Sequence, residues 1–452
     1  MAETGVENES LFDDIADIKE APRYSCSLAG AYASTLGVYG AVPILHSGGG
    51  CGVAQLFGQF YTSGESAPGV QGGTGTPCTS LVEQHVIFGG EERLQKLIRS
   101  TTELMEGSLY VVITGCVPAL IGDDVESVVR KFKEETKNRI PIIYVNAPGF
   151  SGNTYRGYEL FFNAVIDQYL VPIKKKKRTI NILGVVPFQH VFWKGDLEIL
   201  KNTFAKIGVE VNSIFSEFDG AEKLKKIPAA ELNLVLNPWL GHSIAERLEE
   251  KFGTPYITFP SVPVGPQQTT ALLGIVAEKL GIPEKKVKDV IAAEESRAYR
   301  NVEYFGDALI IGMPHSYTAV VGDSATAIGI TKYIANEVGY LPDITIITDN
   351  PPEEQRPEIL HELSDNIDCV VKPEVFFESD THKIRQLLKG RSFLVLLASS
   401  LEKYITDEFN DALHLSVSFP INDRMIIDHS YAGYRGGIVL MEDIITKFTG
   451  PL

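Results

Sequence analysis

Short apolar runs rich in β-branched residues recur along the chain and alternate with charged, amphipathic segments. We expect these runs to form strands, and they are Tyr110–Thr114, Pro141–Val145, Ile180–Val186, Leu232–Leu236, Ala308–Ile311, Ile344–Thr348 and Phe393–Ala398. Runs that are apolar on both faces are typical of strands in parallel sheets that helices cover. Segments between them, such as Asp123–Lys137 and Ser243–Phe252, have helical spacing, and Asp123 or Asp124 is expected to cap the first.

This alternation predicts an α/β fold made of three Rossmann-like, doubly wound domains with parallel sheets. The basic run Lys174–Arg178 and the charged stretch Glu294–Glu303 are expected to separate the domains. The predicted N-terminal domain therefore covers residues 1–178, the second covers 179–300 and the third covers 301–452. In such folds, ligands bind in crevices at the carboxyl ends of the strands.

Composition and charge narrow the function. The chain has 452 residues with 44% hydrophobic and 22% charged side chains, which is typical of globular domains, and its formal net charge is −17. An acidic chain is not expected to bind nucleic acid or an anionic membrane. The acidic N-terminus has no signal-peptide pattern and no run is apolar enough to span a membrane, so a cytoplasmic location is expected. The motifs GxxxxGK[ST], GxSxG and HExxH do not occur, so neither ATP hydrolysis nor common hydrolase chemistry is expected in this chain.

A long uncharged segment near the N-terminus carries the candidate chemistry. Residues 24–64 include no Asp, Glu, Lys or Arg, and they contain Cys26 and Cys51, the second directly after three glycines. Cys78 follows, and Cys116 comes just after an expected strand. Glycines allow the backbone to approach a bulky group closely.

Five cysteines are too few for a disulfide framework, and a single cysteine is more often a small buried hydrophobic residue than a ligand. Without a CxxC motif a zinc site is not favoured, whereas dispersed thiolates suit an iron–sulfur cluster. If three of these cysteines bind such a cluster, they are one short of a four-cysteine site. The missing ligands are then expected from a partner chain. Cys369, in the apolar run Asp368–Val371, is expected to lie in the core.

The cysteine segments resemble the N-terminal region of nitrogenase component 1 subunits. The matching motifs are Cys26-Ser-Leu-Ala-Gly-Ala, His46-Ser-Gly-Gly-Gly-Cys51, Phe88-Gly89-Gly90-Glu91 and Thr114-Gly-Cys116-Val-Pro-Ala-Leu-Ile-Gly122-Asp123-Asp124. The resemblance continues to the C-terminus through Asn237-Pro-Trp239, Pro263-Val-Gly-Pro266, Phe419-Pro420-Ile421 and Gly433-Tyr434-Arg435-Gly436. It therefore covers nearly the whole chain and implies an oxidoreductase.

The resemblance implies a shared cluster site. Cys26, Cys51 and Cys116 would be the thiolates that this chain gives to an iron–sulfur cluster at the interface with a sister subunit. In nitrogenases this is the 8Fe-7S P-cluster, and in some relatives it is a 4Fe-4S cluster. Cys78 is not among the matched positions and is expected to lie near the cluster without binding it.

At two places the sequence differs from known members of the family, and these differences indicate which kind of subunit it resembles. Asn237 and Ala432 stand where the catalytic subunit has the cysteine and histidine that hold its cofactor, so the chain resembles the β-type (K-type) subunit. Gly149 stands where molybdenum nitrogenase β subunits have a serine. We therefore favour a nitrogenase-like reductase such as a methylthio-alkane reductase. A β subunit of an alternative nitrogenase, a cofactor-assembly scaffold subunit and a homodimeric tetrapyrrole reductase remain alternatives.

The resemblance also implies partners. A catalytic α-type (D-type) subunit would complete a heterotetramer of two α-type and two β-type subunits. An ATP-dependent iron protein would deliver electrons, which the cluster would relay to a metallocofactor in the partner, so no catalytic residue is expected here. His46, His190 and His315 are expected to have supporting roles, His46 by bracing the glycine-rich loop.

Overall fold

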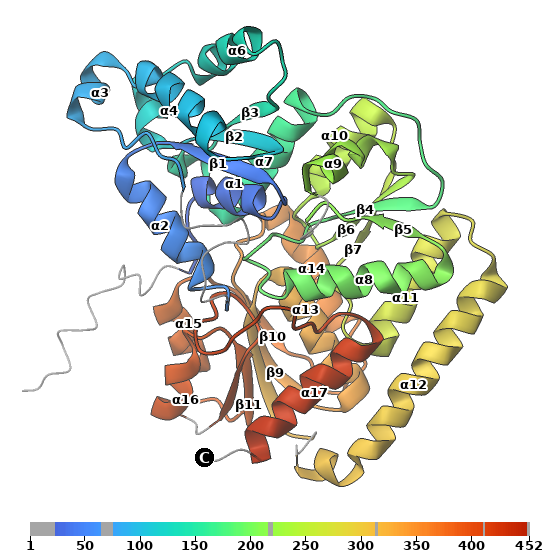
Figure 1. The fold of residues 1–452 in the computed structure, drawn as a ribbon. Helices are drawn as coiled ribbons and strands as arrows, with labels where there is room; N and C mark the ends of the chain where they lie inside the picture. The colour runs from blue at the N-terminus through green and yellow to red at the C-terminus, as the bar shows by residue number, and fades with distance from the viewer. Residues whose placement is uncertain (1–22, 65–75, 216–219, 312–314, 410–411, 450–452) are drawn as a thin grey trace, which may run out of the picture.

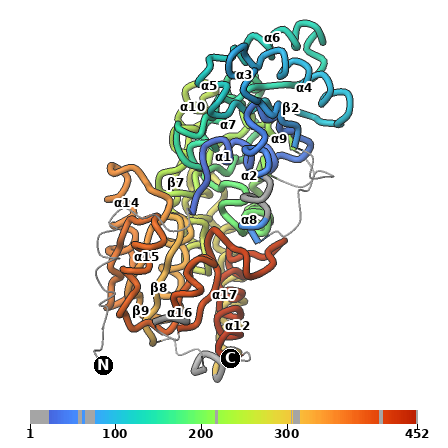
Figure 2. The backbone as a smooth tube through the Cα atoms, turned by 90° about the vertical axis from the view of Figure 1, so that its left-hand side faces the viewer, coloured from blue at the N-terminus to red at the C-terminus, as the bar shows by residue number. Residues whose placement is uncertain are grey.

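The computed structural model describes residues 23–64, 76–215, 220–311, 315–409 and 412–449. The acidic N-terminal segment on which the expected location depends lies outside these residues. Three parallel sheets, each covered by helices, follow one another along the described chain (Figure 1). The helices of the first sheet lie at one end of the molecule and those of the third sheet at the other (Figure 2).

The first sheet carries the cysteines. Its order is β1-β2-β3, and its strands are Ala41–His46, Leu109–Thr114 and Ile142–Asn146. One face packs on α1 and α7, and the other packs on α4 and α6. On the free side of β1, a parallel bridge joins Leu45 to Cys78. The reversal of strand order therefore falls between β1 and β2, which is where open α/β sheets bind their ligands.

The helices of this part begin and end as follows: α1 Ser27–Leu36, α2 Gly49–Phe60, α3 Glu83–Phe88, α4 Glu91–Leu104, α5 Cys116–Ile121, α6 Val125–Glu135, α7 Thr154–Gln168, with the 3₁₀ turn η1 at Gly149–Ser151. Asp124 accepts the backbone N–H of Ser127 at 2.9 Å, so it caps α6 as the sequence predicted.

The second sheet has the order β5-β4-β6-β7. Its elements are β4 Thr179–Leu183, α8 Trp193–Ile207, β5 Glu210–Asn212, α9 Gly220–Lys225, η2 Ile227–Ala229, β6 Leu232–Leu236, α10 His242–Phe252, β7 Tyr256–Phe259, α11 Gly265–Lys279 and α12 Glu284–Ile311. Asn181, Asn212 and Asn233 lie opposite one another on three adjacent strands. Their buried amides form a hydrogen-bonded ladder, with N···O distances of 2.7 Å and 2.9 Å.

The third sheet has the order β10-β9-β8-β11-β12. Its elements are β8 Tyr317–Gly322, α13 Ser324–Tyr333, the π turn η3 Ile334–Val338, β9 Leu341–Ile347, η4 Glu353–Gln355, α14 Arg356–Ser364, β10 Glu374–Phe377, α15 Thr381–Leu388, β11 Val395–Ala398, α16 Lys403–Phe409, β12 Leu413–Ser416 and α17 Gly433–Thr449. The C-terminal helix α17 returns to pack against α11 and α12.

The predicted class of fold, Rossmann-like α/β with parallel sheets, is confirmed. The three sheets fall one to each predicted domain range, and the division at residues 178 and 300 stays a prediction. No helix among the described residues combines the length and apolar character needed to cross a bilayer.

Two local expectations are wrong. Ala308–Ile311 is not a strand but the end of α12, beyond a break at Gly306, and Glu294–Glu303 lies within the same helix. A run of four apolar residues suits a helix as well as a strand, so its pattern alone does not decide. Asp368–Val371 forms a bend in which Cys369 is partly exposed and Val370 is fully exposed, so Cys369 does not lie in the core.

Candidate functional site

The three predicted ligand cysteines each lie at the start of a helix. Cys26 directly precedes α1, Cys51 lies in the first turn of α2, and Cys116 is the first residue of α5. Helix N-termini carry partial positive charge, which stabilises a thiolate there and lowers the cost of gathering several together. No Asp, Glu, Lys or Arg side chain belongs to residues 24–64, so this local field is not cancelled from within the segment.

Gly149 brings two of these cysteines together. It follows β3 in the turn η1, and its N–H donates a hydrogen bond to Cys116 Sγ at 3.0 Å. A Cβ atom at Gly149 would lie 3.1 Å from Cys116 Sγ and 3.4 Å from Cys26 Sγ. The two sulfur atoms therefore converge on this glycine, although Cys26 and Cys116 are far apart in the sequence.

Cys51 and Cys78 belong to the same neighbourhood. Burial raises the pKa of the Cys51 thiol, a hydrogen bond with Ser47 opposes this, and the thiols of Cys26, Cys116 and Cys78 raise the pKa further. A bound metal would reverse this balance, because a coordinating thiol is deprotonated outright. Cys26 and Cys116 thus lie close enough to Cys51 to act on its thiol.

Cys78 faces α2 from the segment that extends the first sheet. Its Sγ accepts the N–H of Ser80 at 3.4 Å, and a Cβ at Gly52 would lie 3.8 Å from it. Cys78 is partly exposed, as are Cys26, Cys51 and Cys116. Cys78 therefore lies beside the predicted ligand cysteines, as expected. The expectation that it does not bind the cluster stays a prediction.

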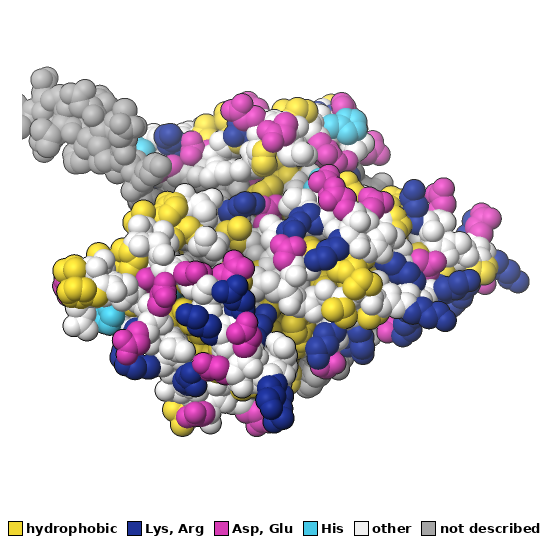
Figure 3. All heavy atoms as spheres, turned by 90° about the horizontal axis from the view of Figure 1, so that it is seen from above, with side chains coloured by type: hydrophobic (Ala, Val, Ile, Leu, Met, Phe, Trp, Pro, Cys, Tyr) yellow, Lys and Arg dark blue, Asp and Glu magenta, His cyan; other side chains and the backbone are white. Residues whose placement is uncertain are grey.

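Exposed apolar side chains lie on the elements that carry the cysteines and Gly149. Val53 of α2, Leu120 of α5 and Phe150 beside Gly149 are 58%, 74% and 63% exposed. Ile87 and Phe88 at the end of α3 are also exposed. Figure 3 shows acidic and basic side chains interspersed, with apolar patches between them, on the face seen from above. Exposed apolar groups around polar ligands are typical of a surface that another protein covers.

The predicted donor set consists of soft thiolates, without oxygen or imidazole ligands. Among the described residues, no three His, Cys, Asp or Glu side chains are grouped as a single metal ion requires. Soft thiolates at positive helix ends, a backbone N–H directed at a sulfur and a glycine that leaves space meet the requirements of an iron–sulfur cluster.

The His46 ring, at the end of β1, contacts two other segments, and its expected bracing of the glycine-rich loop stays a prediction. Its side chain is fully buried, its Nε2 lies 3.0 Å from Asp123 Oδ2, and its Nδ1 lies 3.2 Å from Thr79 Oγ1. Asp123 also accepts the N–H of Gly90 at 2.9 Å. Burial lowers the pKa of His46, since the charged imidazolium is poorly solvated there. The ring thus ties the end of β1 to the loop before α6.

A cavity between the sheets includes Asn237 in its lining. Its volume is about 10 Å³, and its lining also includes Gly184, His190 and Asp323. Such a volume holds about one water molecule. The side-chain oxygen of Asn237 accepts the N–H groups of the two residues that follow Pro238, at 3.0 and 2.8 Å, and so closes a turn. Asn237 therefore has a structural role.

His190 and Ala432 meet at one carboxylate. His190 Nε2 lies 2.5 Å from Asp196 Oδ2, and the N–H of Ala432 donates to Asp196 Oδ1 at 3.1 Å. Burial alone lowers the pKa of His190, but the hydrogen bond and charge of Asp196 outweigh it, so the net shift is upward. His315 is exposed and precedes β8, away from the carboxyl ends of the strands. Asp196 thus fixes the His190 ring near Ala432, and the supporting roles expected for His190 and His315 stay predictions.

Three parallel Rossmann-like sheets, with three cysteines gathered beside the first, define a multi-sheet α/β protein. Comparison of the sequence with known families is specific: residues 26–449 match nitrogenase component 1 type oxidoreductases. The chain belongs to this family, and the predicted β-type member of the superfamily is confirmed.

Individual relatives are distant. The vanadium-iron protein beta chain of Trichormus variabilis is 24% identical over 92% of this chain and 90% of its own length. The molybdenum-iron protein alpha chain of Methanothermobacter marburgensis is 28% identical over 63% of this chain, and the match spans 61% of that relative. The cofactor biosynthesis protein NifE of Clostridium pasteurianum is 29% identical over 57% of this chain and 55% of its own length. Among solved structures, nitrogenase Cp1 superposes with a TM-score of 0.78 at 20% identity, covering 96% of this chain and 93% of that one, which shows the shared fold.

Proposed function

We propose that this chain is the β-type subunit of a nitrogenase-like reductase and holds half of an interface iron–sulfur cluster through Cys26, Cys51 and Cys116. The observation that carries the proposal is the convergence of two of these sulfurs on Gly149 in a partly exposed site. Three thiolates leave such a cluster incomplete, so a catalytic α-type subunit supplies the rest in a heterotetramer of two α-type and two β-type chains.

When bound, an iron–sulfur cluster accepts and passes on single electrons. The residues of this chain set its surroundings. The Gly149 N–H, hydrogen-bonded to Cys116 Sγ, favours the more negative, reduced form, and the N-termini of α1 and α2 act in the same direction. The exposed apolar residues of α3 and α5 provide docking area for the α-type partner and for an ATP-dependent iron protein.

Substrate reduction belongs to the partner subunit in this proposal. The cavity lined by Asn237 has room for about one water, and neither Asn237 nor Ala432 offers a thiolate or imidazole. Gly149 lacks the side-chain oxygen of the molybdenum enzymes, which supports a reductase for substrates such as methylthio-alkanes. Thiolate ligands that must stay reduced favour the cytoplasm.

A second candidate function, the cofactor-assembly scaffold, is favoured by the partial similarity to NifE. A scaffold would retain a cofactor precursor without turnover, whereas a reductase subunit would support reduction of methylthio-alkanes, or of N2 if the complex is an alternative nitrogenase.

The test is iron analysis and EPR of the complex that co-purifies with the tagged chain. Cys26→Ala, Cys51→Ala and Cys116→Ala are each expected to remove interface iron, whereas Cys369→Ala, a partly exposed thiol in the third sheet region, retains it. An interface with about eight irons rather than about four identifies a P-cluster. If all three variants keep the iron and the EPR signal, or if the chain purifies only as a homodimer, the proposed function is wrong.

A further inference from the structure

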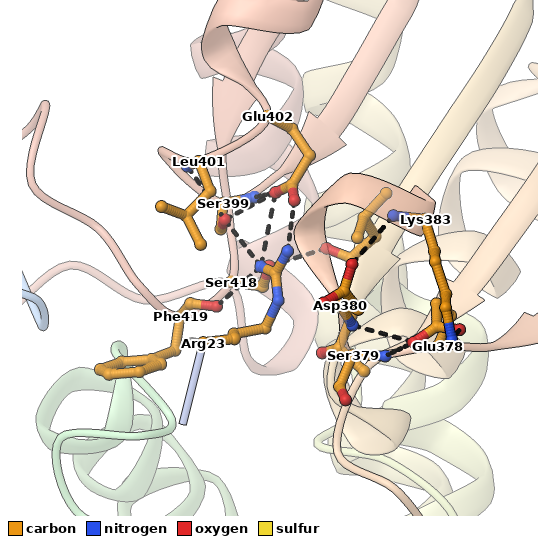
Figure 4. A network of polar contacts seen from close by, with 12 residues as sticks. Arg23, Glu378, Ser379, Asp380, Lys383, Ser399, Leu401, Glu402, Ser418 and Phe419 are labelled. Carbon is orange, nitrogen blue, oxygen red and sulfur yellow. Dashed lines mark hydrogen bonds and ion pairs between the residues drawn. The ribbon is translucent and has the colours of Figure 1, made fainter. Parts of the chain in front are cut away.

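The segment that leads into Cys26 joins two parts of the molecule. Cys26 forms an antiparallel bridge with Asn153, and the N–H of Ser27 donates to the carbonyl of Gly152 at 2.9 Å, so the cysteine itself is held at the start of α7. Three residues earlier, Arg23 lies among loops of the third sheet (Figure 4). A few residues thus span from the third sheet to the sulfur that converges on Gly149.

Arg23 is held by a buried network. Its guanidinium pairs with Glu402, and both side chains are fully buried. The same guanidinium donates to Ser399 Oγ at 2.8 Å and to the carbonyl of Phe419 at 3.4 Å (Figure 4). Glu402 in turn accepts the backbone N–H of Ser399 at 3.0 Å. This forked set of contacts fixes the orientation of the Arg23 side chain as well as its position, because the guanidinium is planar and its donors point in set directions.

Tyr24 adds a second attachment to the third sheet. Its hydroxyl lies 2.8 Å from Thr348 Oγ1, and its ring stacks on Phe419 with centroids 5.9 Å apart. Tyr24 also contacts α7, which covers the first sheet. Its ring packs edge-on against the ring of Tyr155, with centroids 5.1 Å apart. The aromatic contacts therefore tie both parts to the residue two positions before Cys26.

These contacts occupy a place where a doubly wound sheet normally binds a ligand. Ser399 follows β11, Phe419 follows β12 and Thr348 follows β9, so all three lie beyond the carboxyl ends of their strands. The strand order reverses between β8 and β11. Open α/β sheets bind ligands beside such a reversal. In this chain, its own Arg23 and Tyr24 take that place.

We propose that Arg23 is a positioning residue for the Cys26 thiol: its pairing with Glu402 lets the third sheet hold Cys26 against Gly149 and Cys116. This inference rests on the proposed function, since it assigns Cys26 to the cluster. It adds that the third sheet, which contributes no ligand, takes part in holding the cluster through the chain's N-terminal segment.

The experiment uses the co-purified complex and four variants. Arg23→Met removes the fork, and Arg23→Lys keeps the charge with a different geometry. Arg23→Met combined with Glu402→Met replaces the buried pair by apolar side chains, which is often neutral for stability. Lys383→Met is the matched control, because Lys383 is 59% exposed and pairs with Glu378 at 3.7 Å in the same region (Figure 4).

The readouts are the rate of iron release to a chelator, the EPR line shape of the interface cluster and the melting temperature. We expect about tenfold or faster iron release and an altered EPR signal for Arg23→Met, in the range known for groups that orient metal ligands. The double variant is expected to regain the melting temperature but not the line shape, Arg23→Lys to be intermediate, and Lys383→Met to match the wild type.

The outcomes separate the two proposals. If the Arg23 variants lower only the melting temperature, or release iron like Lys383→Met, while Cys26→Ala loses the cluster, the positioning role is wrong and the cluster assignment stands. If Arg23→Met does not assemble, the double variant and Arg23→Lys decide in the same way. If Cys26→Ala itself keeps the iron and the signal, the proposed function fails first.

Discussion

Replacement of Gly149 by alanine tests the convergence of the two sulfurs most directly. The added Cβ would lie 3.1 Å from Cys116 Sγ, 3.2 Å from Cys26 Cβ and 3.4 Å from Cys26 Sγ. Contacts this short are tighter than ordinary van der Waals packing, so one or both cysteines must shift by a few tenths of an ångström. Overpacking of this kind costs about 1–3 kcal/mol.

The cost falls on the groups that hold the cluster, so it should appear in iron retention. Since 1.4 kcal/mol corresponds to about tenfold in an equilibrium constant, we expect Gly149→Ala to weaken iron retention by about tenfold. The assay is iron release from the purified complex to a chelator, together with EPR and the melting temperature. Gly149→Ser adds the same Cβ and a hydroxyl, so a difference between the serine and alanine variants in the oxidised state reports oxygen ligation.

A matched control comes from Gly274 in α11, where a Cβ would meet nothing within 4 Å. Gly274→Ala should leave the iron unchanged and stabilise the helix by up to about 1 kcal/mol. If Gly149→Ala retains wild-type iron release, EPR signal and melting temperature, the added Cβ does not displace Cys26 or Cys116, and the reasoning from the short contacts is refuted.

Two further predictions concern stability. Asn181→Ala removes the centre of the buried amide ladder and leaves Asn233 Oδ1 and one Asn212 N–H without their cross-strand partners, which should cost about 2 kcal/mol or more and lower the melting temperature. An unchanged melting temperature would contradict the ladder's role. Burial raises the pKa of Glu337 to about 7 from an ordinary value of 4.5, so ionisation of Glu337 opposes folding as the pH rises from 4.5 to 7, and the penalty is complete above pH 7. Glu337→Gln should therefore raise the melting temperature at pH 8 by a few degrees and leave it unchanged at pH 4, and an equal gain at both pH values would show that the carboxyl group does not titrate as inferred.

Much of the fold follows from local patterns. Apolar runs such as Tyr110–Thr114 and Leu232–Leu236 form buried parallel strands, because a strand covered on both faces buries its side chains on either side and is therefore mostly apolar. The same rule fails for Ala308–Ile311, which is helical, since four apolar residues fit either period. The rule also misses the strand β8 (Tyr317–Gly322), because its first two residues carry polar groups and leave only a short apolar run.

The candidate site divides in the same way. The cysteine positions and their family pattern are visible in the sequence, as is the lack of a thiol or imidazole at Asn237 and Ala432. The roles of Gly149 toward two sulfurs and of Arg23 toward Glu402 are not visible, because each pairs residues separated by many elements.

The sequence by itself determined the class of fold, the family and the three cysteines, because these depend on the period of apolar residues and on motifs read locally. The tertiary structure decided that two sulfurs meet at a glycine, that a cavity of about 10 Å³ lies beside Asn237, and that the third sheet holds the segment leading to Cys26. The physical reason is that such contacts arise from the packing of whole sheets and helices against one another, which no local pattern encodes.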